Sequence, residues 1–178
     1  LKNEKPTIII NCAGRVGGIL ANSSYPVEFL NENITIQLNL INAAFENKIE
    51  HFINLGSSCI YPKMSQQPIK EEYLLSNYLE KTNEAYAIAK IVGLKSCEFY
   101  NQQFKKSYFT LMPCNLYGPG DNYHPLNSHV LPALITKIMD AKSNNSNKIN
   151  CWGTGNPLRE FLYVDDLAEA CLYALENW

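Results

Sequence analysis

The sequence predicts an α/β fold built on a doubly wound parallel sheet. Three short apolar segments, residues 7–13 (TIIINCA), 51–58 (HFINLGSS) and 108–114 (YFTLMPC), are rich in β-branched and aromatic residues, as buried strands are. The two longer segments between them, 27–47 and 84–104, have helical periodicity. The order strand, helix, strand, helix, strand is typical of a parallel sheet with helices on both faces.

Each predicted helix has its own signal. In segment 27–47 the apolar residues recur three or four positions apart, and they are Phe29, Leu30, Ile34, Leu38, Ile41 and Phe45. Segment 84–104 follows Thr82 or Asn83, either of which is suited to cap a helix.

The pattern becomes less regular after Pro113. Residues 117–124 are rich in Gly, Pro, Asp and Asn and predict a loop, and the polar residues 143–147 predict a linker. The other elements expected here are a helix at 130–141, a short strand at 149–152 and a final helix at 166–176 capped by Asp165.

Composition excludes several classes of function. The 178 residues are 46% hydrophobic and carry a formal net charge of −2, so electrostatics give no case for nucleic acid as a partner. No apolar run approaches the roughly 18 residues of a membrane span, and the polar start of the chain does not resemble a signal peptide. Because the chain begins with Leu1 and enters a strand almost at once, we expect it to be a piece of a longer protein.

The six cysteines do not form a recognisable disulfide or metal-binding spacing. Cys12, Cys97, Cys114 and Cys171 lie within apolar runs, where cysteine behaves as a small hydrophobic residue. Reduced thiols, a cytoplasmic location and the absence of a metal site are therefore expected.

Tyr86 and Lys90 form the first candidate for catalysis. They are four residues apart in a predicted helix and so share one face, where an ammonium group would stabilise a phenolate and lower the tyrosine pKa. A surface pair is the alternative interpretation of this spacing alone.

Ser57 adds to the case, because it follows a predicted strand and ligands bind beyond the carboxyl ends of parallel strands. Loops 14–18, 56–62 and 115–121 all leave such ends and are expected to share one cleft.

This set resembles the Ser, Tyr and Lys of short-chain dehydrogenases. Segments 56–62 (GSSCIYP), 83–90 (NEAYAIAK) and 115–121 (NLYGPGD) are similar to motifs of the GDP-L-fucose synthase family. Segments 16–22 (VGGILAN) and 159–166 (REFLYVDD) match the same family, and the resemblance runs from about residue 8 to the end of the chain.

The resemblance implies an NADPH-dependent enzyme that epimerises and then reduces GDP-4-keto-6-deoxy-mannose. Cys59 would be the base and His129 the acid of epimerisation, at pKa values that suit physiological pH. In the reduction Tyr86 would supply the proton, Ser57 would bind the ketone oxygen, and Lys90 would also hold the nicotinamide ribose. Without the resemblance, Cys59 would be interpreted as a buried thiol and His129 as a residue that caps or packs at a helix start.

The resemblance also assigns binding residues. Lys137, Trp152 and Arg159 would contact the GDP-sugar, with Arg159 on the diphosphate. Asn33 would be a buried polar support of the site. The cofactor NADP(H) would be bordered by Leu55, Gly56, Ser57, Ser58, Tyr86, Lys90, Pro113, Cys114, Asn115, Leu116 and His129.

The expected organisation follows from the same resemblance. Residues 1–116 would be the C-terminal portion of a Rossmann-like NADP-binding domain, without the Gly-rich turn that holds pyrophosphate. Residues 117–178 would be part of a smaller substrate domain, with 149–178 returning in part to the main sheet. A homodimer is expected through the helices at 27–47 and 84–104. The alternatives are another sugar-nucleotide 4-epimerase or 4,6-dehydratase, or a non-catalytic protein that keeps the fold.

Overall fold

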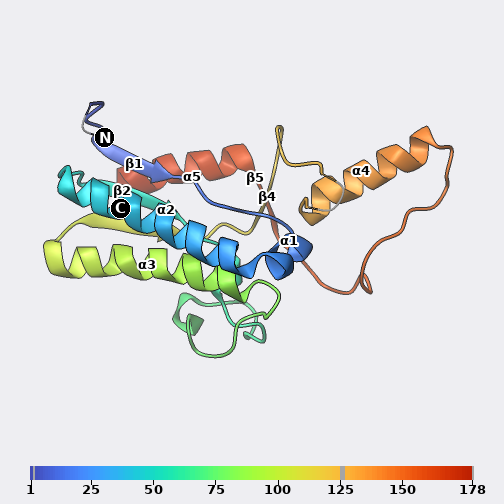
Figure 1. The fold of residues 1–178 in the computed structure, drawn as a ribbon, viewed down its shortest axis with the longest axis horizontal. Coiled ribbons are helices and arrows are strands. Elements are labelled where there is room, and N and C mark those ends of the chain that lie inside the picture. The colour runs from blue at the N-terminus through green and yellow to red at the C-terminus, as the bar shows by residue number, and fades with distance from the viewer. Residues whose placement is uncertain (2, 125–126, 178) are drawn as a thin grey trace.

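Three parallel strands form the main sheet of the computed structural model, which describes residues 1, 3–124 and 127–177 (Figure 1). Strand β2 (His51–Leu55) lies between β1 (Ile8–Asn11) and β3 (Ser107–Leu111). Ile8 is paired with His51, and His51 with Ser107, so the three strands start level and end at one edge. The strands stop sooner than predicted, because the residues after Leu55 and Leu111 leave the sheet as loops.

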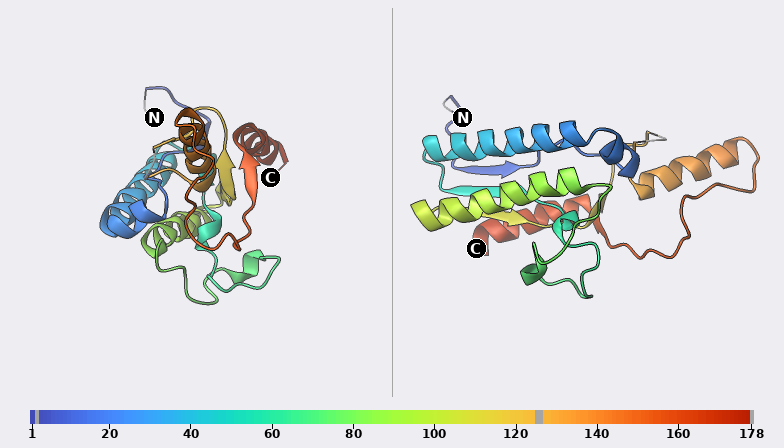
Figure 2. Two further views of the ribbon diagram at one scale, coloured as in Figure 1. Left: turned by 90° about the vertical axis from the view of Figure 1, so that its right-hand side faces the viewer. Right: turned by 60° about the horizontal axis from the view of Figure 1, so that its bottom comes forward.

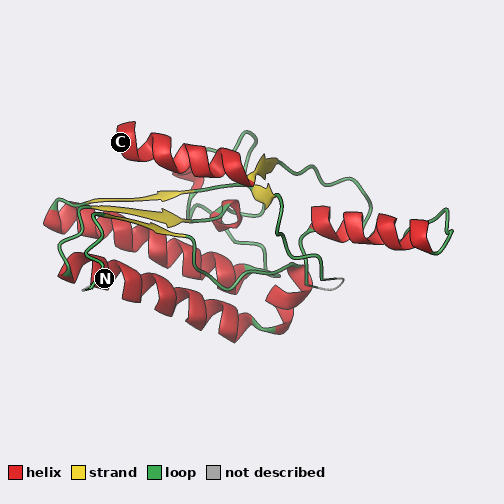
Figure 3. Cartoon of the chain, turned by 90° about the horizontal axis from the view of Figure 1, so that it is seen from above, coloured by secondary structure: helices red, strands yellow, loops and turns green. Residues whose placement is uncertain are grey.

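Helices cover both faces of this sheet, as Figure 3 shows. Helices α2 (Pro26–Glu46) and α3 (Glu84–Phe104) lie on one face, and α5 (Val164–Asn177) lies on the other. Neighbouring residues of β2 point to opposite faces, so Phe52 packs under α2 and α3 while Ile53 packs under α5. This arrangement confirms the predicted doubly wound α/β fold.

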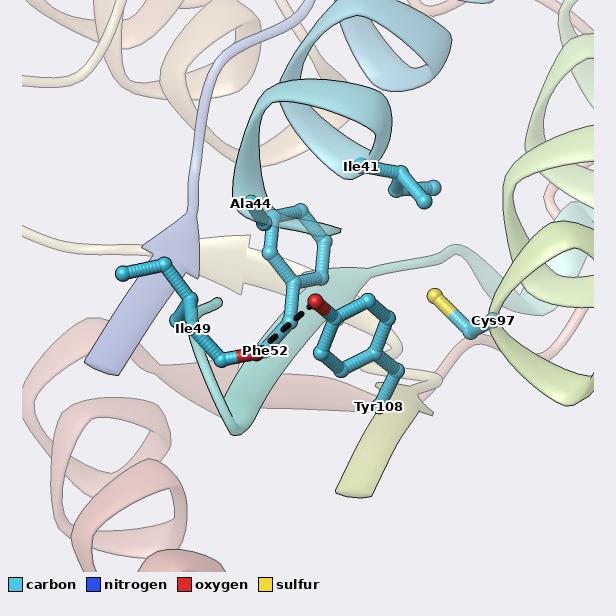
Figure 4. Packing of buried hydrophobic residues seen from close by; sticks show 6 residues of the cluster. All are labelled: Ile41, Ala44, Ile49, Phe52, Cys97 and Tyr108. Carbon is cyan, nitrogen blue, oxygen red and sulfur yellow. Dashed lines mark hydrogen bonds between the residues drawn. The ribbon is translucent and has the colours of Figure 1, made fainter. Parts of the chain in front are cut away.

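The larger core cluster lies under α2 and α3 (Figure 4). It consists of Ile41, Ala44, Ile49, Phe52, Cys97 and Tyr108. The buried Tyr108 hydroxyl donates a hydrogen bond of 2.9 Å to the Ile49 carbonyl oxygen, which gives this polar group the partner that burial requires. The bond fixes the turn that leads from α2 into β2.

Local sequence explains where the long helices begin and end. Pro26 occupies the first turn of α2, where its missing N–H has no helical partner in any case. Helix α3 begins after Asn83, which makes no side-chain cap hydrogen bond, and ends at Lys105 in the left-handed conformation. A short helix that the sequence did not suggest, α1 (Ile19–Ser24), precedes α2.

The C-terminal third is less compact. Strands β4 (Asn115–Tyr117) and β5 (Phe161–Tyr163) pair in parallel, while α4 (Val130–Ser143) extends away from the body of the molecule (Figures 1 and 2). The chain returns to the main sheet through α5, whose Leu167 and Cys171 pack on Ile53 and Phe109.

Two predictions for this region were wrong. Residues 149–152 form no strand, because no neighbouring strand offers them hydrogen-bonding partners and Trp152 is 71% exposed. Residues 115–117, expected in a loop, form β4 because β5, 46 positions further along the chain, pairs with them. Of the cysteines expected to pack, Cys97 and Cys171 are buried, but Cys12 is exposed. No helix in the described part of the chain is long and apolar enough to cross a membrane.

Candidate functional site

The loops that follow β1, β2 and β3 meet around the first turns of α3. The Gly56 N–H donates to the Leu111 carbonyl oxygen at 2.8 Å, and the Ser58 N–H donates to that of Pro113 at 3.3 Å. The residues after β2 and after β3 therefore run side by side. On the other side, a Cβ at Gly14 would lie 3.8 Å from Lys90 Nζ, so the loop after β1 passes directly over that ammonium group.

Lys90 is the central charge of this site. Its side chain is 5% exposed, and Nζ donates a hydrogen bond of 2.7 Å to the Leu55 carbonyl oxygen at the end of β2. Burial lowers the pKa of Lys90, while electrostatic interaction with Cys59 and Cys12 opposes that change. An ammonium group has three N–H donors, and the described residues use one of them, so two remain for a bound molecule.

Tyr86 lies one helical turn before Lys90, with its ring centroid 5.6 Å from Lys90 Nζ. Its ring also packs edge-on against Phe29, at 6.1 Å between centroids. Burial and the neighbouring Cys59 raise the pKa of Tyr86 above its ordinary value. The expectation that Lys90 lowers this pKa was therefore wrong, because Lys90 bonds Leu55 and lies beside the ring, and loss of solvent dominates. Tyr86 keeps its proton and suits the role of an acid.

Ser57 and Cys59 follow β2 directly. Ser57 is in extended conformation and caps a single 3-10 turn, Ser58–Ile60, where its Oγ accepts the Cys59 N–H at 3.4 Å. Burial raises the pKa of the Cys59 thiol, and the Ser57 hydrogen bond and the Lys90 charge only partly oppose this. Cys59 is thus close to both Lys90 and Tyr86, but as a neutral thiol rather than the ready thiolate that the sequence suggested.

His129 is at the N-cap of α4 and is exposed. The residues just before it contact the loop after β1, since the Gly18 N–H donates to the Asn127 carbonyl oxygen at 3.2 Å. A Cβ at Gly18 would lie 2.8 Å from the Ser128 carbonyl oxygen, which leaves room only for glycine. No hydrogen bond or ring contact joins the His129 imidazole to Cys59 or Tyr86 in the structure as described. The structure thus anchors the start of α4 beside the loop after β1.

Asn33, expected to support the site, holds the loop after β1 in place. Its Oδ1 accepts the Arg15 N–H, its Nδ2 donates to the Arg15 carbonyl oxygen, and both distances are 3.0 Å. Asn33 is 1% exposed, and both hydrogen bonds are partly buried. Gly14 fits between Asn33 and Lys90, since an added Cβ would be 2.9 Å from Asn33 Oδ1.

The three residues assigned to the GDP-sugar are not all brought together. Lys137 Nζ donates to the Asn150 carbonyl oxygen at 2.8 Å and lies 5.3 Å from the Trp152 ring centroid, so α4 holds the loop that carries Trp152. Arg159 is exposed, and among the described residues its side chain donates to the neighbouring Leu158 carbonyl oxygen alone. Its segment is attached to β4, because Asn115 Nδ2 donates to the Glu160 carbonyl oxygen at 2.9 Å.

The residues assigned to the cofactor border one stretch of backbone at the end of the main sheet. They are Leu55, Gly56, Ser57 and Ser58 after β2, and Pro113, Cys114, Asn115 and Leu116 after β3. In the described residues, no group of His, Cys, Asp or Glu could hold a metal ion.

Sequence analysis missed one part of this region, a set of buried amides behind Lys90. Asn11 and Asn54 interrupt otherwise apolar strands, and Gln37 lies one turn after Asn33 on the buried face of α2. A polar residue at a position that periodicity assigns to the core was the signal available for each of them.

The whole chain is similar to known proteins. The model of the family described as "NAD dependent epimerase/dehydratase family" matches residues 1–178. GDP-L-fucose synthase 1 of Arabidopsis thaliana is 53% identical over 175 residues, which are 98% of this chain and 54% of that protein. GDP-L-fucose synthase of Escherichia coli K12 is 51% identical over 174 residues, or 98% of this chain and 54% of that protein. The chain thus spans about half the length of the curated relatives it matches.

The solved structures agree in fold. A GDP-L-fucose synthetase from Naegleria fowleri, bound to NADP, is 32% identical with a TM-score of 0.85. That alignment covers 96% of this chain and 56% of the other.

Proposed function

We propose a function on the basis that this chain belongs to the NAD dependent epimerase/dehydratase family. The full-length protein is a GDP-L-fucose synthase that converts GDP-4-keto-6-deoxy-mannose to GDP-L-fucose with NADPH. The observation that carries the proposal is the grouping of Ser57, Cys59, Tyr86 and Lys90 at the end of β2. High identity to GDP-L-fucose synthases supports it.

Epimerisation comes first. The 4-ketone of the substrate acidifies the protons on both neighbouring carbons, so a base and an acid suffice to invert them. Cys59 acts as the base and His129 as the acid. The Cys59 thiol must lose its proton before it can act as the base. Burial raises its pKa, while the hydrogen bond with Ser57 and then the Lys90 charge favour the thiolate.

Reduction of the ketone follows. NADPH, when bound, supplies the hydride. Tyr86 donates the proton to the ketone oxygen, and its raised pKa means that it still carries this proton at neutral pH. The Ser57 Oγ already accepts the Cys59 N–H, so its own O–H is available to donate to the same ketone oxygen.

The described residues fit the nicotinamide end of NADP(H). Lys90 retains two N–H donors for the ribose hydroxyls, and the backbone after β2 and β3 borders the place where the cofactor would lie. For the diphosphate of the GDP-sugar, Lys137 and Arg159 supply positive charge. The exposed Trp152 ring supplies an apolar face.

The proposal extends to organisation and location. Residues 1–116 belong to the cofactor domain and 117–178 to the substrate region. The protein is a homodimer through α2 and α3, because Ile88 and Phe99 leave an apolar stripe exposed on α3. A cytoplasmic location fits six free thiols. Sedimentation of the full-length protein at micromolar concentration tests the dimer, and a monomer would reject it.

The experiment that tests the activity uses the full-length protein, GDP-4-keto-6-deoxy-mannose and NADPH. The expected result is consumption of NADPH with GDP-L-fucose as the product, identified by sugar analysis. Tyr86→Phe is the matched control and is expected to lose product. If the protein instead interconverts a sugar nucleotide at C4 without net use of NADPH, it is a 4-epimerase. If it dehydrates GDP-mannose, it is a 4,6-dehydratase. No turnover of any of these leaves a non-catalytic member of the family.

A further inference from the structure

A chain of buried amide side chains crosses the molecule behind Lys90. Asn11 Nδ2 donates to Asn54 Oδ1 at 3.0 Å, and Asn54 Nδ2 donates to Gln37 Oε1 at 3.2 Å. Gln37 Nε2 then donates to the Ala89 carbonyl oxygen at 3.0 Å and to that of Asn33 at 2.9 Å. The three amide side chains belong to residues that are at most 3% exposed, so these bonds join β1, β2, α2 and α3 away from water.

Both ends of this chain reach backbone that borders the candidate site. At one end, Asn11 Oδ1 accepts the Ala13 N–H at 3.1 Å, just before the loop that passes over Lys90. At the other end, the Ala89 carbonyl belongs to the residue directly before Lys90. Gln37 is the member that contacts α3, and no other side chain in the described residues is recorded as donating to the Ala89 carbonyl oxygen.

Gly93 has no side chain at the place where the Gln37 amide lies against α3. A Cβ at Gly93 would overlap Gln37 Oε1 and would lie 2.9 Å from Asn54 Nδ2. Gly93 is one turn after Ala89 on α3, so the absence of its side chain is what lets the helix approach Gln37 this closely. A fit between one amide and one glycine therefore allows α3 to lie close to Gln37 and Asn54.

We propose that Gln37 is a positioning residue for Lys90. By holding the Ala89 carbonyl, it fixes the turn of α3 from which the Lys90 side chain reaches the Leu55 carbonyl oxygen. A shift of that turn would move the ammonium group away from Leu55 and from the ribose that it is proposed to bind. The readouts rest on the proposed function, although one of them, NADPH affinity, does not need the sugar substrate.

Gly93→Ala and Gln37→Ala, alone and together, test the fit in the full-length protein. In Gly93→Ala alone, the added methyl group would displace α3 from Gln37. A misplacement of catalytic groups by about 1 Å typically costs on the order of 100-fold in rate. In the Gln37→Ala background the added methyl group enters space that the amide has left. The double variant is therefore expected to bind NADPH and to turn over no worse than Gln37→Ala alone. Independent, additive losses from the two changes would overturn the proposal.

Gln37→Leu separates positioning from simple packing. It keeps most of the side-chain volume but cannot bond Ala89 or Asn54. Its matched control is Ile41→Val, one turn later on the same helix and in the core cluster. Both variants are expected to lower Tm, but only Gln37→Leu should weaken NADPH binding and reduce kcat, each by about tenfold or more. Equal kcat and NADPH affinity in the two variants would show that Gln37 merely packs.

Gln37→Glu provides a pH signature. A buried carboxyl group stays neutral until its raised pKa is reached, and in that form it accepts from Asn54 and donates its O–H to Ala89. The NADPH affinity of the variant should match that of the parent at low pH and should fall at a lower pH than that of the parent, which falls only when Lys90 itself loses its proton. A profile that follows the parent at all pH values would overturn the proposal. If the parent binds NADPH but does not form GDP-L-fucose, the proposed function fails while the binding cycle still decides the role of Gln37.

Discussion

The ammonium group of Lys90 donates a hydrogen bond of 2.7 Å to the carbonyl oxygen of Leu55, and this bond joins α3 to the last residue of β2. It helps a lysine that is 95% buried to be tolerated here, since the protein satisfies one of its three N–H donors. It also holds the ammonium group 5.6 Å from the centroid of the Tyr86 ring.

Lys90→Met should therefore remove a charge and also the hydrogen bonds that the ammonium group makes. The methionine fills the space but leaves the Leu55 carbonyl oxygen without its partner and the proposed ribose site without donors. We expect kcat for GDP-L-fucose formation to fall by about 100-fold or more, with weaker NADPH binding. Lys95→Met is the matched control, because Lys95 is on the same helix and makes only a partly exposed ion pair with Glu98. Equal activity of the two variants in steady-state assays would remove Lys90 from the site.

Lys137 and Trp152 should act on the sugar nucleotide and not on the cofactor. Trp152→Ala is expected to raise the Kd for GDP by roughly tenfold or more, since aromatic anchors commonly contribute over 1 kcal/mol to binding. Lys137→Ala should have a similar effect, and the double variant should lose less than the sum because the two side chains contact each other. Calorimetric titration with GDP and with NADPH measures both. Lys148→Ala, on the nearby exposed loop, serves as the control. An equal loss of NADPH affinity would mean that these residues maintain the fold instead.

Alkaline pH should weaken the fold through Cys97. Burial raises the pKa of this thiol to about 12, whereas in the unfolded chain it is about 8.5. Above pH 8.5 the unfolded state loses the proton and the folded state keeps it, so the unfolded state binds fewer protons and stability falls as pH rises. The contribution is complete below pH 8.5, and about 2 kcal/mol of it should be lost by pH 10.

Urea unfolding at pH 7 and pH 10 measures this loss. Cys97→Ala should be less stable than the parent at pH 7 but should lose less stability between the two pH values. Cys151→Ala removes an exposed thiol and should keep the parent's pH dependence. A parent whose stability changes no more than that of Cys97→Ala would contradict the assignment.

The sequence predicted the main sheet because its signals are local. Segments such as 51–58 are apolar and β-branched over their own length, and helix 84–104 was predicted at the bounds that α3 has. Strands β4 and β5 could not be predicted in the same way. Each has three residues, and each is a strand only because the other, more than 40 positions away, pairs with it.

Part of the geometry of the candidate site was predictable from the sequence, but its electrostatics were not. Spacing puts Tyr86 and Lys90 on one face of a helix, as the structure has them. The direction in which the Tyr86 pKa shifts depends on how deeply α3 is buried and on which group Lys90 bonds. The spacing of Tyr86 and Lys90 determines neither. The Gln37 contact with Ala89 was hidden for a similar reason, because it joins two helices through a space that only Gly93 leaves open.

The sharpest test separates the two chemical steps. Epimerisation moves protons on carbon and should require Cys59 and His129, whereas reduction protonates the ketone oxygen and should require Tyr86. Removing one positioned acid or base costs about 100- to 10,000-fold in rate. In the full-length protein, Tyr86→Phe should lose reduction by such a factor and still exchange the C–H protons beside the ketone for solvent deuterium. Cys59→Ser should lose most of that exchange and can still reduce the unepimerised ketone, giving a different sugar.

Mass spectrometry of the sugar nucleotide in deuterated water reads both steps together. Tyr61→Phe, which removes a hydroxyl group two residues after Cys59, controls for general disturbance of this loop. If Cys59→Ser exchanged deuterium at the parent rate, the thiol would be only a buried packing group, and the base of the epimerisation would have to be another residue of the cleft.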